Sequence, residues 1–157
     1  SDESPVIFPD YKDVTVPYNI APLNFMIEGA DRLQARFILD GKSFLDVIGK
    51  DGILDIHEKE WTGLLEQAKG AKLTVEVSMW NDEHPDGVVF KPFEVNVSGN
   101  KIDAWVAYRL IEPGYEGWRQ LGLYQRNLES FEETAIVTNK DATTTCLNCH
   151  HFLRRVS

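Results

Sequence analysis

The amino-acid sequence predicts an all-β or mainly β fold, in which antiparallel strands form a sandwich with one inserted helix. Three observations support this prediction. Apolar and polar residues alternate with period two, turn residues separate the alternating segments, and only one segment carries helix signals. The 157 residues, 43% hydrophobic and 26% charged, are typical of a globular chain that buries its own core.

Strand alternation is clearest over residues 32–39 and 72–80, where every second side chain is apolar. Asp40-Gly41 and the run 49–52 predict turns, because both supply the positive φ angles of tight hairpins. The other expected strands cover 43–48, 53–56, 88–97, 102–111, 118–126 and 134–138, with a loop over 81–87 and a turn over 98–100 that pairs 88–97 with 102–111. Short strands in this number are typical of an Ig- or fibronectin-like β-sandwich.

One helix is predicted, over residues 57–69. Asp55 is the expected N-cap, Glu58 its capping-box partner, and Gly70 the expected stop. An apolar stripe at helical spacing should face the core, and it consists of Trp61, Leu64, Leu65 and Ala68.

We expect three regions along the chain. Residues 1–13 hold two prolines and several acidic side chains, which predicts an extended and loosely held arm. Residues 14–139 carry the strands of one β-sandwich domain. Residues 140–157 form a polar linker that ends in a cysteine motif.

The net charge and the motifs of the sequence exclude several classes of function. The formal net charge is −9 and the basic residues are scattered, which argues against a nucleic-acid partner. The sequence has no apolar run of about 18 residues to span a bilayer, and no phosphate loop, nucleophile elbow or zinc-protease string. Glu112 and Glu116 are only a weak candidate for a carboxylate pair. We therefore expect no enzyme activity.

Both cysteines fall in one C-x-x-C-H string, Cys146-Leu147-Asn148-Cys149-His150. Shuffled sequences of this composition contain the string in roughly 1 of 3,000 cases. Two thiols at this spacing can form thioethers with the two vinyl groups along one porphyrin edge, and the adjacent imidazole can bind the iron. The motif therefore predicts covalent haem c on Cys146 and Cys149, with His150 as the proximal iron ligand.

Other uses of the motif stay open. Zinc could take both thiols and His150 or His151, although structural zinc usually draws four ligands from two knuckles. A thioredoxin-type dithiol would follow a strand at a helix start, which this segment does not. A disulfide over so short a loop would stabilise little. Two inert thiols are the remaining interpretation.

Only residues 151–157 follow the motif in this sequence, so we expect either that a distal haem ligand comes from upstream or that the sequence is a fragment of a longer chain. The candidates are Met26, Met79, His57 and His84. Both methionines fit core positions better, and His57 fits the first turn of the helix. His84, in an acidic loop, is the preferred candidate.

Four strings together resemble a Bacteroidetes family of exported proteins, in which a β-rich domain and a C-x-x-C-H segment precede a TolB-like propeller of PD40 repeats. They are VPYNIAPLNF at 16–25, YRLIEPGYE at 108–116, GLYQRNL at 122–128 and CLNCHHF at 146–152. The resemblance implies a C-terminal propeller domain as a partner, which this chain lacks, and a lipid anchor before the acidic start as the only membrane attachment.

The main functional hypothesis is an exported haem-binding electron-transfer module, in the periplasm or at the outer-membrane surface, that works with a redox partner protein. Production in the cytoplasm of a host should leave the motif without haem. The competing hypothesis is a non-catalytic docking domain of a surface lipoprotein, for carbohydrate or protein. It draws on aromatic side chains such as Trp80 and Trp105, which fall on the strand phase opposite the apolar faces.

Overall fold

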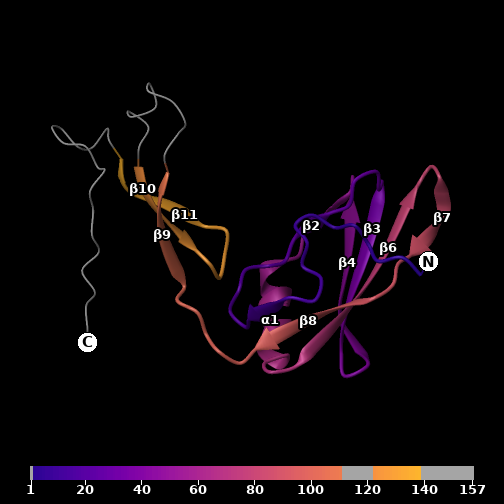
Figure 1. Ribbon diagram of the computed structural model, residues 1–157, viewed down its shortest axis with the longest axis horizontal. Coiled ribbons are helices and arrows are strands. Elements are labelled where there is room, and N and C mark those ends of the chain that lie inside the picture. Colours follow the sequence, from indigo (N-terminus) through magenta and orange to yellow (C-terminus); the bar gives the residue numbers. More distant parts are fainter. Residues whose placement is uncertain (1, 111–121, 139–157) are drawn as a thin grey trace. The chain divides into compact units, whose positions relative to one another are not determined.

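The computed structural model describes residues 2–110 and 122–138, and the chain divides into two compact units, Ser1–Ile102 and Asp103–Ser157. Strands dominate both units, and the described part of the chain contains one helix (Figure 1). The prediction of a mainly β fold with one inserted helix is confirmed. The finer prediction of an Ig-like sandwich stays a prediction.

The first unit is built on one eight-stranded sheet. Its order is β1-β8-β6-β3-β4-β5-β2, and β7 pairs with β6 beside β8. Every pairing is antiparallel except that of β1 with β8. The strands are β1 (Thr15–Pro17), β2 (Phe25–Met26), β3 (Arg32–Leu39), β4 (Lys42–Lys50), β5 (Ile53–Leu54), β6 (Lys72–Asn81), β7 (His84–Val89) and β8 (Phe93–Ser98).

The sheet must curl, because its two end strands are close in sequence. In a flat sheet β1 and β2 would lie six strand spacings apart, or roughly 29 Å. Residues 18–24 join them, and the eight steps from Pro17 to Phe25 would just reach this distance, about 29 Å, if fully extended. They are shorter than that, since the N–H of Ile20 donates to the Pro17 carbonyl at 3.2 Å and closes a turn.

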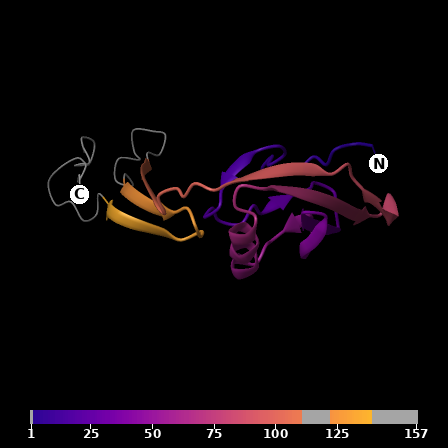
Figure 2. The ribbon, with the colours of Figure 1, turned by 90° about the horizontal axis from the view of Figure 1, so that it is seen from below.

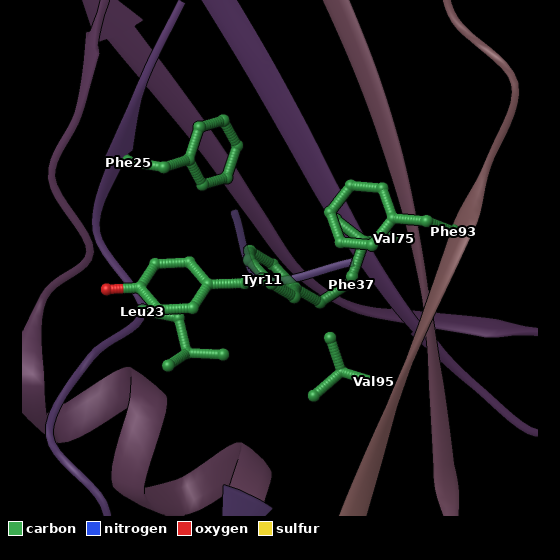
Figure 3. Close-up of a pocket in the computed structure, with 7 residues that line it drawn as sticks. All are labelled: Tyr11, Leu23, Phe25, Phe37, Val75, Phe93 and Val95. Carbon is green, nitrogen blue, oxygen red and sulfur yellow. The ribbon is translucent and has the colours of Figure 1, made fainter. Parts of the chain in front are cut away.

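The curled sheet encloses one apolar core on its inner face. The alternation over 32–39 places Leu33, Ala35, Phe37 and Leu39 there, all buried, and Leu73, Val75 and Val77 of β6 join them. A small void of about 10 Å³ remains beside Phe37 and Val95 (Figure 3). Its lining is apolar, so it offers an ordered water no partner. Burial raises the pKa of Tyr11, which borders this void.

Both predicted hairpin turns form. Asp40-Gly41 has φ values of 48° and 75°, and Asp51-Gly52 has 52° and 73°. Two consecutive positive φ angles are the signature of the type I′ turn, whose twist suits a two-residue hairpin. These turns join β3 to β4 and β4 to β5.

Helix α1 (Glu58–Gln67) closes the core from one side of β6 and β8 (Figure 2). The predicted stripe of Trp61, Leu64, Leu65 and Ala68 is buried, and the Trp61 ring meets Phe37 edge-on at 5.6 Å. The predicted cap is wrong. His57 is the N-cap and makes no side-chain cap bond. The Asp55 carboxylate, the expected cap, accepts a hydrogen bond from the Asn24 side chain.

The expected hairpin between 88–97 and 102–111 is wrong. β7 begins at His84, within the predicted loop, and β7 and β8 run one after the other along the same edge of β6, with a break at Phe90–Pro92. The far edge of β8 is taken by β1 in parallel register, so no place beside it remains for the strand that follows.

The N-terminal arm is extended but not loosely held. Pro5 and Ile7 are buried, and Phe8 exchanges two backbone hydrogen bonds with Met26 at 2.8 and 2.9 Å. The carbonyl of Glu3 also accepts a bond from the N–H of Lys91. The buried apolar residues of the arm therefore pack with the core. The composition of the arm, with its prolines and acidic residues, had predicted loose attachment instead.

The second unit contains a three-stranded antiparallel sheet. Its strands, in the order β11-β10-β9, are β9 (Trp105–Leu110), β10 (Gly122–Asn127) and β11 (Glu133–Thr138). The expected single domain over 14–139 therefore crosses the boundary between the two units. All buried hydrophobic side chains of the described residues lie in the first unit. The alternating pattern in the second unit therefore predicts its strands correctly but does not show that they share the core of the first unit.

We predict that Trp61→Phe lowers the free energy of unfolding by about 2 kcal/mol, because it leaves a cavity and an unpaired carbonyl. Trp61 is 1% exposed, and its indole N–H donates to the Ile20 carbonyl at 3.0 Å. Urea unfolding followed by circular dichroism measures the change. Trp105→Phe, at a position 44% exposed, is the control and should change stability by about 0.5 kcal/mol or less. Equal losses in both variants would contradict the role given to Trp61.

Candidate functional site

The predicted haem site lies outside the described residues. Cys146, Cys149 and His150 all fall within 139–157, as does the linker before them. Within 2–110 and 122–138, no three or more His, Cys, Asp and Glu side chains lie close enough together to hold a metal ion. The haem assignment therefore continues to rest on the sequence motif.

His84, the predicted distal ligand, is the first residue of β7 and is exposed. It follows a two-residue turn, Asp82-Glu83, and its backbone N–H donates to the Asn81 side chain at 2.9 Å. The acidic surroundings inferred from the sequence are present at this turn. Its role as an iron ligand stays a prediction.

The other three ligand candidates occupy different surroundings. Met79 is half-buried against the core, as expected for a core methionine. His57 is exposed at the start of α1. Met26 was expected in the core but is 43% exposed, because β2 turns Phe25 inward and its neighbour outward.

A groove on the outer face of the sheet is the site that the structure adds. It has a volume of about 280 Å³ and crosses three neighbouring strands, β3, β6 and β7. Its lining combines polar and apolar side chains, and they are Gln34, Arg36, Glu76, Ser78, Trp80 and Val89. The period-two alternation of the sequence predicted that most of these side chains face away from the core. It could not predict that they lie together, because that depends on the register between the strands.

A charged ladder crosses the floor of this groove. Arg36 faces Asp46 of β4 on one side and Glu76 of β6 on the other, in register with both. The guanidinium lies 3.3 Å from Glu76 and 3.8 Å from Asp46, and Gln34 donates to the same Asp46 carboxylate at 2.9 Å. Exposed ion pairs add little stability, so their main effect is to hold these side chains in place.

Trp80 forms one wall of the groove and is held on two sides. The Arg32 guanidinium lies 4.6 Å from the indole ring centroid, in a cation–π contact. Gly87 approaches the five-membered ring so closely that a Cβ there would lie 2.7 Å from Cε2. With φ at +86°, this position excludes side chains on both grounds. Gly87 lies against the five-membered ring at Nε1 and Arg32 lies over the indole, so Trp80 is not a free stacking platform.

A second polar cluster lies on the sheet of the second unit. Tyr108 and Tyr124 are cross-strand partners with ring centroids 6.0 Å apart, and the Tyr108 hydroxyl donates to the Glu133 carboxylate. This hydrogen bond, followed by desolvation, raises the pKa of Tyr108 above its ordinary value. The suspected carboxylate pair, Glu112 and Glu116, lies outside the described residues.

We predict that Tyr108 ionises at higher pH than an ordinary tyrosine and that Glu133→Gln lowers its pKa. A phenol with a raised folded pKa contributes stability below its unfolded pKa, and this contribution is lost as pH rises through the folded value. Ultraviolet difference titration of the wild type, Glu133→Gln and Tyr108→Phe measures the effect. Identical titration curves for wild type and Glu133→Gln would rule out the carboxylate as the cause.

Comparison with known proteins gives no family or function for this chain. No family model, no curated protein and no solved structure matches the chain. In the described part of the chain, no helix is long and apolar enough to cross a membrane. The resemblance to the propeller-linked family stays a prediction.

Proposed function

We propose that this protein is an exported c-type haem-binding module for electron transfer. The single observation that carries the proposal is the C-x-x-C-H string of Cys146, Cys149 and His150, which contains both cysteines of the chain. The family resemblance supports it, because the resembling strings include this same segment.

The donor set fits covalent haem. Cys146 and Cys149 would hold the porphyrin edge through two thioether bonds, and His150 would give an imidazole nitrogen to the iron. When bound, the haem supplies a one-electron couple. The described residues contribute two β-rich units, and a polar stretch of sequence over 140–145 precedes the motif.

Zinc is the main competitor for the same side chains. A structural zinc site normally takes four Cys or His ligands. The sequence has no further cysteine, so zinc would have to complete its shell without the second cysteine knuckle that is usual for structural zinc sites. The donor chemistry therefore favours haem.

Haem attachment implies where the protein acts. Thioether formation depends on assembly machinery outside the cytoplasm, so we place the protein in the periplasm or at the outer-membrane surface. An electron-transfer module also needs a protein that exchanges electrons with it. A separate redox protein is the proposed partner, and a propeller domain is the partner that the resemblance implies.

We predict covalent haem when the full chain is exported in a bacterium that has a cytochrome c maturation system. The protein should show a Soret band, and acid–acetone should not extract the haem. Replacing both cysteines (C146A/C149A) should abolish attachment, because no thioether can form. Asn148→Ala, inside the motif but without a thiol, is the matched control and should keep its haem.

Two results would overturn the proposal. One is exported protein that lacks haem and carries zinc in equal amount to the chain. The other is haem that stays attached in C146A/C149A. Pyridine haemochrome spectra and metal analysis on the same samples separate these outcomes. Protein made without a leader, in the cytoplasm, should be free of haem and serves as the reference.

A further inference from the structure

We infer that the groove on the outer face of the first unit binds a small neutral polyhydroxylated ligand, such as one or two sugar residues. The site is lined by Gln34, Arg36, Glu76, Ser78, Trp80 and Val89 and has a volume of about 280 Å³. Pockets for small molecules begin at roughly 300 Å³, so the groove suits a small ligand. The inference is independent of haem, because every lining residue precedes the cysteine motif by more than fifty positions.

Unused hydrogen-bonding groups gather in this groove. Among the described residues, the Trp80 indole N–H and the Ser78 hydroxyl make no hydrogen bond, and the Gln34 amide uses only its nitrogen, toward Asp46. The Trp80 N–H is therefore a donor, the Gln34 carbonyl oxygen is an acceptor, and the Ser78 hydroxyl can donate or accept. A sugar hydroxyl both donates and accepts, so it matches this mixed set.

The charges around the groove indicate a neutral ligand. The lining contains one basic and one acidic group, Arg36 and Glu76, and they are paired with each other at 3.3 Å. No excess of either sign is left to attract an ion. Paired planar groups of this kind can still bind neutral hydroxyls, because their remaining N–H groups and carboxylate oxygens project from the sheet.

An apolar wall completes the site. Val89 of β7 is 58% exposed, and the half-buried indole of Trp80 lies on the adjacent strand. A sugar ring has C–H groups that can pack on the exposed Val89 side chain while its hydroxyls bond to the floor; the indole borders this wall but offers no open face. Arg32 and Gly87 hold the indole in place, so binding would cost little ordering of this side chain.

Backbone pairing favours a sugar over an extended peptide. Peptides bind open sheets mainly by adding a strand to an edge. β3 is paired on both sides, by β4 and β6, and β6 is paired on both sides, by β3 and by β7 with β8. Five of the six lining residues therefore lie on strands whose backbone groups are already paired, and only Val89 lies on a strand, β7, that is paired in the sheet on one side.

The test uses the full chain labelled with nitrogen-15 and a panel of neutral probes: glucose, galactose, mannose, maltose, cellobiose and lactose. At least one probe should bind saturably and shift the Trp80 indole N–H resonance. Gln34→Ala and Ser78→Ala should each weaken binding by about tenfold, because each removes a group that bonds to a hydroxyl. Thr74→Ala, on the same face of β6 but outside the groove, is the matched control and should bind as the wild type.

Three results would overturn the inference. They are no saturable binding by any probe, equal affinity in wild type, Gln34→Ala and Ser78→Ala, and tighter binding of a polyanion or an unstructured peptide in the same titration. The nitrogen-15 spectra also show whether each variant is folded. C146A/C149A should bind the probe like the wild type, so failure of the haem proposal would leave this result unchanged.

Discussion

The structure of the first unit depends on burying the apolar inner face of a single curled sheet. Trp61 meets this need most directly, because it packs edge-on against Phe37 and hydrogen-bonds to Ile20 in the link between the two end strands. The same side chain therefore joins the helix, the sheet centre and the segment that makes the sheet curl. The N-terminal arm covers the remaining inner surface with Pro5 and Ile7.

Covering one face leaves the other available for binding. In β3 and β6 the period of two that buries Phe37 and Val75 turns Arg36 and Glu76 outward. The outer side chains need not fill a core, so they can keep hydrogen-bonding groups unused. Their positions are still fixed, because the strands beneath them are held by the core and by cross-strand ion pairs.

Local features of the fold could be predicted from the sequence, and long-range pairings could not. Asp51-Gly52 adopts its predicted turn because the two positive φ angles depend on those two residues alone. Alternation tells which face a residue occupies, but not which strand lies beside it. Nothing near β8 in the sequence indicates that Thr15–Pro17 pairs with its outer edge, and this pairing displaced the expected hairpin. The groove escaped prediction for the same reason, since it depends on the register that sets Arg36 opposite Glu76.

The two proposed activities place different demands on the chain. Covalent haem attachment needs only thiols and an imidazole at the right spacing, so a short motif is sufficient to predict it. Recognition of a sugar needs several weak groups held at fixed separations, which a rigid sheet supplies and a short motif cannot. The motif can therefore be found in the sequence, whereas the groove depends on the register that sets Gln34 of β3 opposite Ser78 of β6, the strand that also carries Trp80.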